Sequence, residues 1–121
     1  IADLFEIPVS RHTENHRADV EPIDGLTVLA ENETAGLGLL ADDANRRFYM
    51  FNHLEYDSQT LREEYDRDVK AGQTIVLPHN YFPNDDPAQT PPNKWRSHAH
   101  MLYGNWVNWV YQNTPFNLDD L

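Results

Sequence analysis

Cysteine is absent from the 121 residues of this sequence. The absence excludes disulfide bonds and thiolate metal sites within the chain. It also means that the chain holds no thiol that could act as a nucleophile. A reaction that needs a thiol must take it from residues outside this sequence.

Long apolar runs are absent as well. No stretch approaches the roughly 20 apolar residues that a membrane-spanning helix requires, and the start of the chain lacks the features of a secretion signal. We therefore expect a soluble protein of the cytoplasm with no membrane partner. The chain begins at Ile1 instead of methionine, so we also expect it to be a piece of a longer protein.

Basic side chains are few. Nine lysine and arginine residues stand against twenty aspartate and glutamate residues, which gives a formal net charge of −11. A chain of this charge repels phosphate groups, so we expect no nucleic-acid partner. Hydrophobic residues make up 40% of the chain and aromatic residues 12%, which is enough to pack the core of one domain.

Three short runs of strand-forming residues lie at positions 26–30, 37–41 and 47–51. Acidic residues and asparagine separate them and supply turns, so we predict a small meander of strands. The third run is continuously apolar from Phe48 to Phe51, which is typical of a strand covered on both faces. We therefore predict that this strand lies at the centre of a sheet.

Two helices are predicted after the strands. The first begins after a cap at Asp57 or Ser58 and ends near Gly72. The second spans residues 95–113, and a stripe that includes its three tryptophans predicts heavy burial.

The remaining segments are predicted to be irregular. Residues 1–24 contain a dense polar cluster, and residues 73–93 are rich in proline and show little periodicity. Strands and helices thus alternate along the chain, which predicts an α/β fold.

The junction between the third strand and the first helix carries the clearest chemical signal. His53 and Glu55 stand two positions apart there, so in an extended segment their side chains point to the same side. A carboxylate on one imidazole nitrogen selects the tautomer and leaves the other nitrogen free to accept a proton. This is the base and orienting carboxylate of acyl-transfer chemistry. The pair alone also fits a structural histidine that only forms hydrogen bonds.

Several segments match the pattern of one known family, in order and at compatible spacing. They are Ser10-Arg11, His53-Leu54-Glu55-Tyr56-Asp57-Ser58-Gln59-Thr60-Leu61, Arg67-Asp68-Val69, Ala71-Gly72, Asn80-Tyr81-Phe82-Pro83, Asp85-Asp86-Pro87, Trp95-Arg96-Ser97-His98 and Asn105-Trp106. Together they span nearly the whole chain. The sequence resembles the homoserine O-succinyltransferase and O-acetyltransferase family of methionine biosynthesis.

The resemblance implies a fold and a set of roles. Such enzymes have a flavodoxin-like fold similar to class I glutamine amidotransferases and a Cys-His-Glu triad. By that likeness, residues 1–121 are the carboxy-terminal part of a single acyltransferase domain, and the cysteine lies earlier in the chain. His53 would be the base, Glu55 its orienting carboxylate, and Ser10 and Arg67 would contact the acceptor amino acid or shape its pocket. The resemblance also implies an acyl-CoA co-substrate, no cofactor and a possible homodimer.

The sequence departs from the family pattern at two places. The family usually shows Gly-His-Pro-Glu where this chain has Asn52-His53-Leu54-Glu55, and it usually has histidine where Val9 stands. Asparagine tolerates unusual backbone angles, so we expect Asn52 to preserve the turn, whereas loss of the proline should loosen it. The donor (succinyl or acetyl) and the acceptor (homoserine or serine) remain open. A glutamine amidotransferase-like hydrolase and a non-catalytic binding module are the alternatives.

Two other clusters have plain structural explanations. Arg67 stands among acidic residues of a predicted helix, so the residues alone favour a surface ion pair, and only the resemblance favours a substrate clamp. His12 and His16 lie near Glu14, but this segment is predicted to be a loop and lacks a firm third ligand. We therefore expect no metal.

Overall fold

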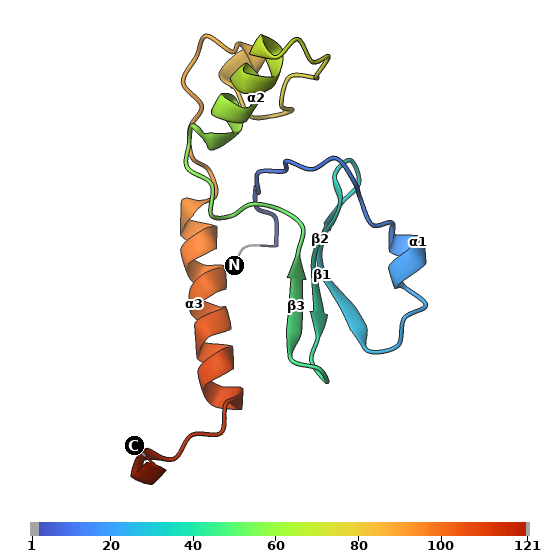
Figure 1. The fold of residues 1–121 in the computed structure, drawn as a ribbon, viewed down its shortest axis with the longest axis vertical. Helices are drawn as coiled ribbons and strands as arrows, with labels where there is room; N and C mark the ends of the chain where they lie inside the picture. Colours follow the sequence, from blue (N-terminus) through green and yellow to red (C-terminus); the bar gives the residue numbers. More distant parts are fainter. Residues whose placement is uncertain (1–2, 121) are drawn as a thin grey trace.

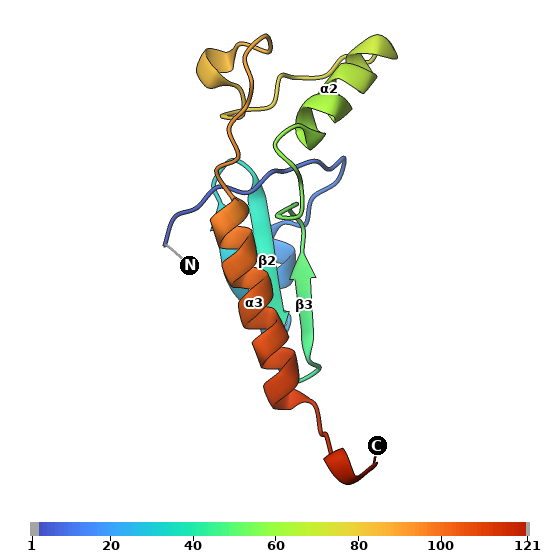
Figure 2. The ribbon, with the colours of Figure 1, turned by 90° about the vertical axis from the view of Figure 1, so that its left-hand side faces the viewer.

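The computed structural model describes residues 3–120, and it combines a three-stranded sheet with helices in a small α/β fold. Helix α2 and the long loop after it lie beyond one end of the sheet, while α3 runs alongside the sheet (Figures 1 and 2). The elements in chain order are α1 (Arg17–Val20), β1 (Leu26–Asn32), β2 (Gly36–Asp42), β3 (Arg47–Met50), α2 (Thr60–Lys70), the 3-10 helix η1 (Pro83–Asp85), α3 (Arg96–Asn113) and the 3-10 helix η2 (Leu118–Asp120).

The predicted meander is confirmed, but its central strand is not the predicted one. The strands pair antiparallel in the order β1-β2-β3, so β2 is the middle strand. Most residues of β2 are buried, whereas β3 alternates between exposed and half-buried residues. The prediction that the third run lies at the centre is therefore wrong within residues 3–120. An apolar run shows which residues can be buried, but strand order depends on which strands pair.

Gly38 in β2 allows a close approach that positions the segment after β3. A Cβ atom added at Gly38 would lie 2.9 Å from Nδ2 of Asn52, so any larger residue would push Asn52 away. Asn52 is not among the described residues with positive φ, so a left-handed backbone angle is not what favours asparagine there. Its side chain packs against the glycine of the neighbouring strand instead.

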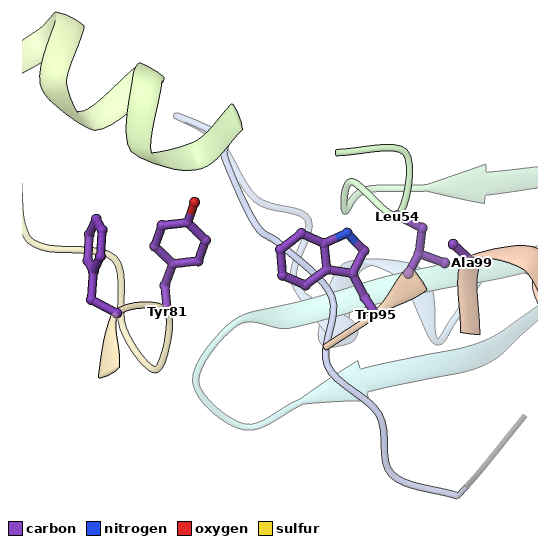
Figure 3. Close-up of a cluster of buried hydrophobic side chains, with 5 residues drawn as sticks. Leu54, Tyr81, Trp95 and Ala99 are labelled. Atoms are coloured by element: carbon purple, nitrogen blue, oxygen red, sulfur yellow. The ribbon is translucent and has the colours of Figure 1, made fainter. Parts of the chain in front are cut away.

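Two buried clusters support the two parts of the fold. One joins the sheet to α1 and is centred on Val20, Leu37 and Leu40. The other joins the segment after β3, the loop after α2 and the start of α3, and Figure 3 shows it around the Trp95 ring. Its buried members are Leu54, Tyr81, Phe82, Trp95 and Ala99. The segment that carries His53 and Glu55 is thus anchored by Leu54 in the second cluster.

Helix α2 has the predicted extent, although its start is built differently. No side chain caps its amino terminus at Gln59, and the hydroxyl of Thr60 accepts a hydrogen bond from the backbone N–H of Asp57 at 3.1 Å. The predicted cap by Asp57 or Ser58 is therefore wrong. The predicted end is confirmed, because Gly72 has a φ of +74° and its N–H donates to the carbonyl of Val69 at 3.0 Å.

Helix α3 confirms the second predicted helix but not the burial of all its tryptophans. Trp95, at its amino-terminal cap, is 4% exposed, whereas Trp106 is 47% exposed. Trp109 contacts the edge of Phe48 in β3, with ring centroids 5.0 Å apart. Tryptophans on a helix are heavily buried only where other residues pack over them. Within residues 3–120, the first turn of α3 is covered far better than its middle. No helix in this part of the chain is long and apolar enough to span a membrane.

The predicted irregular segments are largely confirmed. Residues 73–93 contain only the short η1, and residues 3–24 contain only the four-residue α1, which was not predicted. One turn of helix is too short to display a hydrophobic period.

Trp95 should contribute strongly to stability. Its Nε1–H donates to the carbonyl of Tyr56 at 2.9 Å, so Trp95→Phe removes a buried hydrogen bond and leaves a small void. We expect the complete protein to lose about 1–3 kcal/mol of unfolding free energy, measured by urea denaturation. Tyr111→Phe, at a side chain that is 71% exposed, is the control and should change it by less than about 0.5 kcal/mol. Equal losses in both variants would contradict this role.

Candidate active site

The candidate site forms where the chain leaves β3. The N–H of Phe51 donates to the carbonyl of Gly38 at 3.0 Å, and the N–H of His53 donates to the carbonyl of Pro8 at 2.9 Å. These bonds hold the segment after β3 between the sheet and the irregular amino-terminal segment. Figure 1 shows this amino-terminal segment, in blue, crossing the end of the sheet beneath α2.

His53 and Glu55 are in direct contact. Nδ1 of His53 lies 2.7 Å from Oε1 of Glu55, which is the distance of a strong charge-assisted hydrogen bond. The predicted proximity of the two residues is therefore observed, but they meet in a turn and not in an extended segment, since the N–H of Tyr56 approaches the carbonyl of His53 at 3.4 Å. Leu54 between them is 2% exposed and lies in the core, whereas the side chains of His53 and Glu55 are 31% and 54% exposed.

The second nitrogen of His53 faces Ser10. Nε2 lies 3.2 Å from the backbone carbonyl oxygen of Ser10, which is 43 positions away in the sequence. A hydrogen on Nδ1 is directed at Glu55, and a second hydrogen on Nε2 would be directed at this carbonyl. The surroundings thus offer an acceptor to each ring N–H of the imidazolium, whereas in the neutral tautomer with hydrogen on Nδ1 the Nε2 lone pair would face the carbonyl oxygen of Ser10.

Tyr56 contacts both sides of the site, and the sequence analysis missed it. Its ring stacks on the His53 imidazole with centroids 4.3 Å apart and an interplanar angle of 19°. Its hydroxyl donates to Oε1 of Glu64 at 2.7 Å. Burial raises the pKa of the Tyr56 hydroxyl, the nearby carboxylates of Glu64 and Glu55 raise it further, and the Ser10 side chain lowers it. The hydroxyl therefore stays a neutral donor near neutral pH.

One of the two carboxylate oxygens of Glu64 has no hydrogen-bond partner within residues 3–120. Oε1 accepts from Tyr56, but the buried Oε2 has no hydrogen-bond partner within residues 3–120. A buried acceptor without a donor is costly, so such an atom is suited to receive a donor from a bound molecule. Neither Tyr56 nor Glu64 was predicted as a site residue. Only their position in the turn and on α2 brings them together.

Arg67 lies one turn after Glu64 on α2 and does not contact His53. Its Nε donates to Oδ1 of Asp68 at 2.8 Å, and its side chain is 66% exposed. The contact with Asp68 raises the pKa of the Arg67 guanidinium, and the charge of Glu64 contributes in the same direction. Arg67 therefore stands on the Glu64 side of the site while paired as the residues alone predicted.

The four predicted site residues thus fall into two groups. His53, Glu55 and Ser10 are joined by hydrogen bonds, whereas Arg67 pairs with Asp68 one turn after Glu64 and forms no hydrogen bond with the other three within residues 3–120. Among the described residues, no three histidine, aspartate or glutamate side chains gather closely enough to hold a metal ion.

The chain is similar in sequence to a family of known enzymes. Residues 1–116 match the family model of homoserine O-succinyltransferase. The chain is 54% identical over 120 residues to a homoserine O-acetyltransferase of Rhizobium johnstonii, covering 99% of this chain and 39% of that protein. It is 54% identical to the homoserine O-acetyltransferase of Hyphomonas neptunium over the same shares, and 53% identical over 116 residues to that of Cereibacter sphaeroides. The chain therefore spans 39% or less of the length of these curated relatives.

Proposed function

Because this chain belongs to the homoserine O-succinyltransferase family, we propose that it is the carboxy-terminal part of a homoserine O-acyltransferase. In this proposal it supplies the base His53 and the orienting carboxylate Glu55, and a cysteine nucleophile comes from the rest of the same domain. The observation that carries the proposal is the contact of 2.7 Å between Nδ1 of His53 and Oε1 of Glu55. The amidotransferase-like fold of the whole domain is part of the same proposal.

The proposed reaction has two half-reactions. The cysteine thiol gives its proton to Nε2 of His53 and its sulfur attacks the thioester carbonyl of acyl-CoA; the C–S bond to CoA then breaks, and CoA leaves with that proton while the acyl group stays on the cysteine. In the second half-reaction, Nε2 of His53 takes the proton from the acceptor hydroxyl. The hydroxyl oxygen then attacks the enzyme thioester, which returns the thiolate and releases the ester.

Glu55 and Ser10 support the proton transfer in this mechanism. Glu55 keeps the hydrogen on Nδ1, so Nε2 is the nitrogen that receives the reacting proton. The carbonyl of Ser10, 3.2 Å from Nε2, stabilises the imidazolium that forms. The acyl-CoA is a co-substrate, and the mechanism uses no cofactor and no metal. The complete enzyme is proposed to be a homodimer.

The acceptor is proposed to be homoserine and the donor acetyl-CoA. The relatives that are 53–54% identical to this chain are named for acetyl transfer to homoserine, which favours acetyl over succinyl as the donor group. Ser10 and Arg67 are proposed to face the acceptor, since the Ser10 backbone lies 3.2 Å from Nε2 of His53 and Arg67 lies one turn after Glu64 on α2. Arg67 would exchange Asp68 for the carboxylate of the amino acid.

The test is a substrate panel with the complete purified protein. It is incubated with acetyl-CoA or succinyl-CoA and with homoserine or serine, while released CoA and the ester product are measured by absorbance and mass spectrometry. O-Acetylhomoserine as the main product supports the proposal, and transfer to serine or from succinyl-CoA would correct the substrate. Hydrolysis of glutamine without acyl transfer would replace the proposal by an amidotransferase-like function, and absence of all turnover would favour a binding module.

Replacement of Arg67 by lysine should weaken acceptor binding selectively. Lysine keeps the charge but loses the two-pronged hydrogen bonding that guanidinium offers to a carboxylate. We expect the KM for homoserine to rise roughly tenfold, while the KM for the acyl donor stays within about twofold. Steady-state kinetics of the complete enzyme check this, with Lys70→Arg on the same helix as the control. An unchanged KM for homoserine would mean that Arg67 only forms a surface ion pair with Asp68.

A further inference from the structure

Tyr56 links the two halves of the candidate site, and nothing in the proposed mechanism yet uses it. We propose that Tyr56 is a positioning residue that holds the His53 ring and the Glu64 carboxylate at a fixed separation, so that an acceptor bound beside Glu64 presents its hydroxyl to Nε2. This inference rests on the proposed acyl-transfer function. It assigns Tyr56 no direct part in the chemistry.

The first support is the stacking of Tyr56 on His53. A hydrogen bond to Glu55 fixes one atom of the imidazole, but the ring can still tilt about that bond, and the Glu55 side chain is 54% exposed. The Tyr56 ring lies nearly parallel to the imidazole, with centroids 4.3 Å apart, and removes this freedom. Because Nε2 must meet the acceptor hydroxyl, the tilt of the ring sets the geometry of proton transfer.

The second support is the hydroxyl of Tyr56. It donates to Oε1 of Glu64 at 2.7 Å, so the carboxylate is held by one oxygen while the buried Oε2 stays unpartnered within the described chain. Burial and the neighbouring carboxylates raise the pKa of this hydroxyl, which keeps it a donor. The same tyrosine therefore sets the position of the free oxygen and of the imidazole.

The third support is that the backbone at Tyr56 is held by other residues in addition to its own side chain, which packs against the edge of the core cluster. Its backbone carbonyl accepts the hydrogen bond from Nε1 of the buried Trp95, and Leu54, two positions earlier, lies in the same core cluster as Trp95. The turn should therefore persist when the side chain of Tyr56 is changed. Variants at this position can separate positioning from folding.

The experiment compares Tyr56→Phe with Tyr56→Leu in the complete enzyme. Tyr56→Phe keeps the stacked ring and loses only the hydroxyl, so the KM for the acceptor should rise roughly tenfold while the rate of CoA release in the first half-reaction stays within about twofold. Tyr56→Leu also loses the stack, so the rate of CoA release should fall as well, by roughly tenfold. Tyr65→Phe is the matched control, since the Tyr65 hydroxyl forms no hydrogen bond in the described chain, and it should change neither value.

A second measurement needs no turnover. The 15N chemical shifts of the His53 imidazole in the complete protein report how much of the ring carries its hydrogen on Nδ1. Positioning by Tyr56 predicts that Tyr56→Leu lowers this fraction and Tyr56→Phe does not. An active enzyme whose acceptor KM and His53 shifts are unaffected by both variants would overturn the inference. A wild-type protein without acyl transfer, whose His53 shifts still respond to Tyr56→Leu, would refute the proposed function but keep the positioning.

Discussion

His53→Ala in the complete enzyme is expected to slow acyl transfer by at least about 10²–10⁴-fold, which is the usual contribution of a general base. The substitution removes Nε2, the proposed proton acceptor for both half-reactions. It also removes the partner of Glu55 and the ring that stacks on Tyr56. Acceptor binding should change little, because the imidazole acts mainly in the transition state.

Single-turnover transfer from acyl-CoA to homoserine is the measurement for this variant, with circular dichroism to verify folding. His100→Ala, at an exposed position on α3, is the matched histidine control and should behave as wild type. A well-folded His53→Ala enzyme with near-normal transfer would make the pair with Glu55 structural and remove the main support for the mechanism.

Glu55→Gln is expected to produce the second largest loss, of about 10- to 100-fold in kcat. Glutamine keeps the shape of the side chain but has no charge to stabilise the imidazolium, and its amide nitrogen can turn toward Nδ1 and favour the wrong tautomer. The Glu55 side chain is 54% exposed, so solvent screens part of its charge, and we expect a smaller loss than for His53→Ala.

The control for this variant is Glu63→Gln, which removes a charge from an exposed position on α2 without touching His53. The quantity to compare is kcat at saturating acceptor and donor. A Glu55→Gln enzyme with the kcat of the Glu63→Gln enzyme would show that the hydrogen bond of 2.7 Å has no catalytic weight.

Features that depend on neighbouring residues were predictable from the sequence. The three strand runs, helix α2 with its end at Gly72 and helix α3 each have a local period or a local end signal, and all appear in the structure. The contact between His53 and Glu55 was also predictable, since residues two positions apart can hardly separate when the residue between them is buried. Even here the backbone is a turn, because burial of Leu54 does not require an extended segment.

The failed predictions concern which strands pair with each other and which side chains are covered by the rest of the protein. The apolar run of β3 lies at the edge of the sheet, and Trp106 is half exposed, because the apolar pattern of a segment does not name the surface that packs against it. The predicted cap at Asp57 or Ser58 failed for a related reason. Polar side chains near a helix start can bond to several nearby backbone groups, and here the Thr60 hydroxyl accepts from the N–H of Asp57 while no side chain caps the helix at Gln59.

Residue types and local spacing by themselves therefore determined the strand and helix segments and the pairing of His53 with Glu55. Tertiary structure alone decided what surrounds that pair. Ser10 reaches Nε2 of His53 from 43 positions away, Trp95 reaches the Tyr56 carbonyl from 39 positions away, and Glu64 meets Tyr56 across the start of α2. Contacts between distant positions leave no local period in a sequence, because they depend on how the chain packs and not on which residues are adjacent.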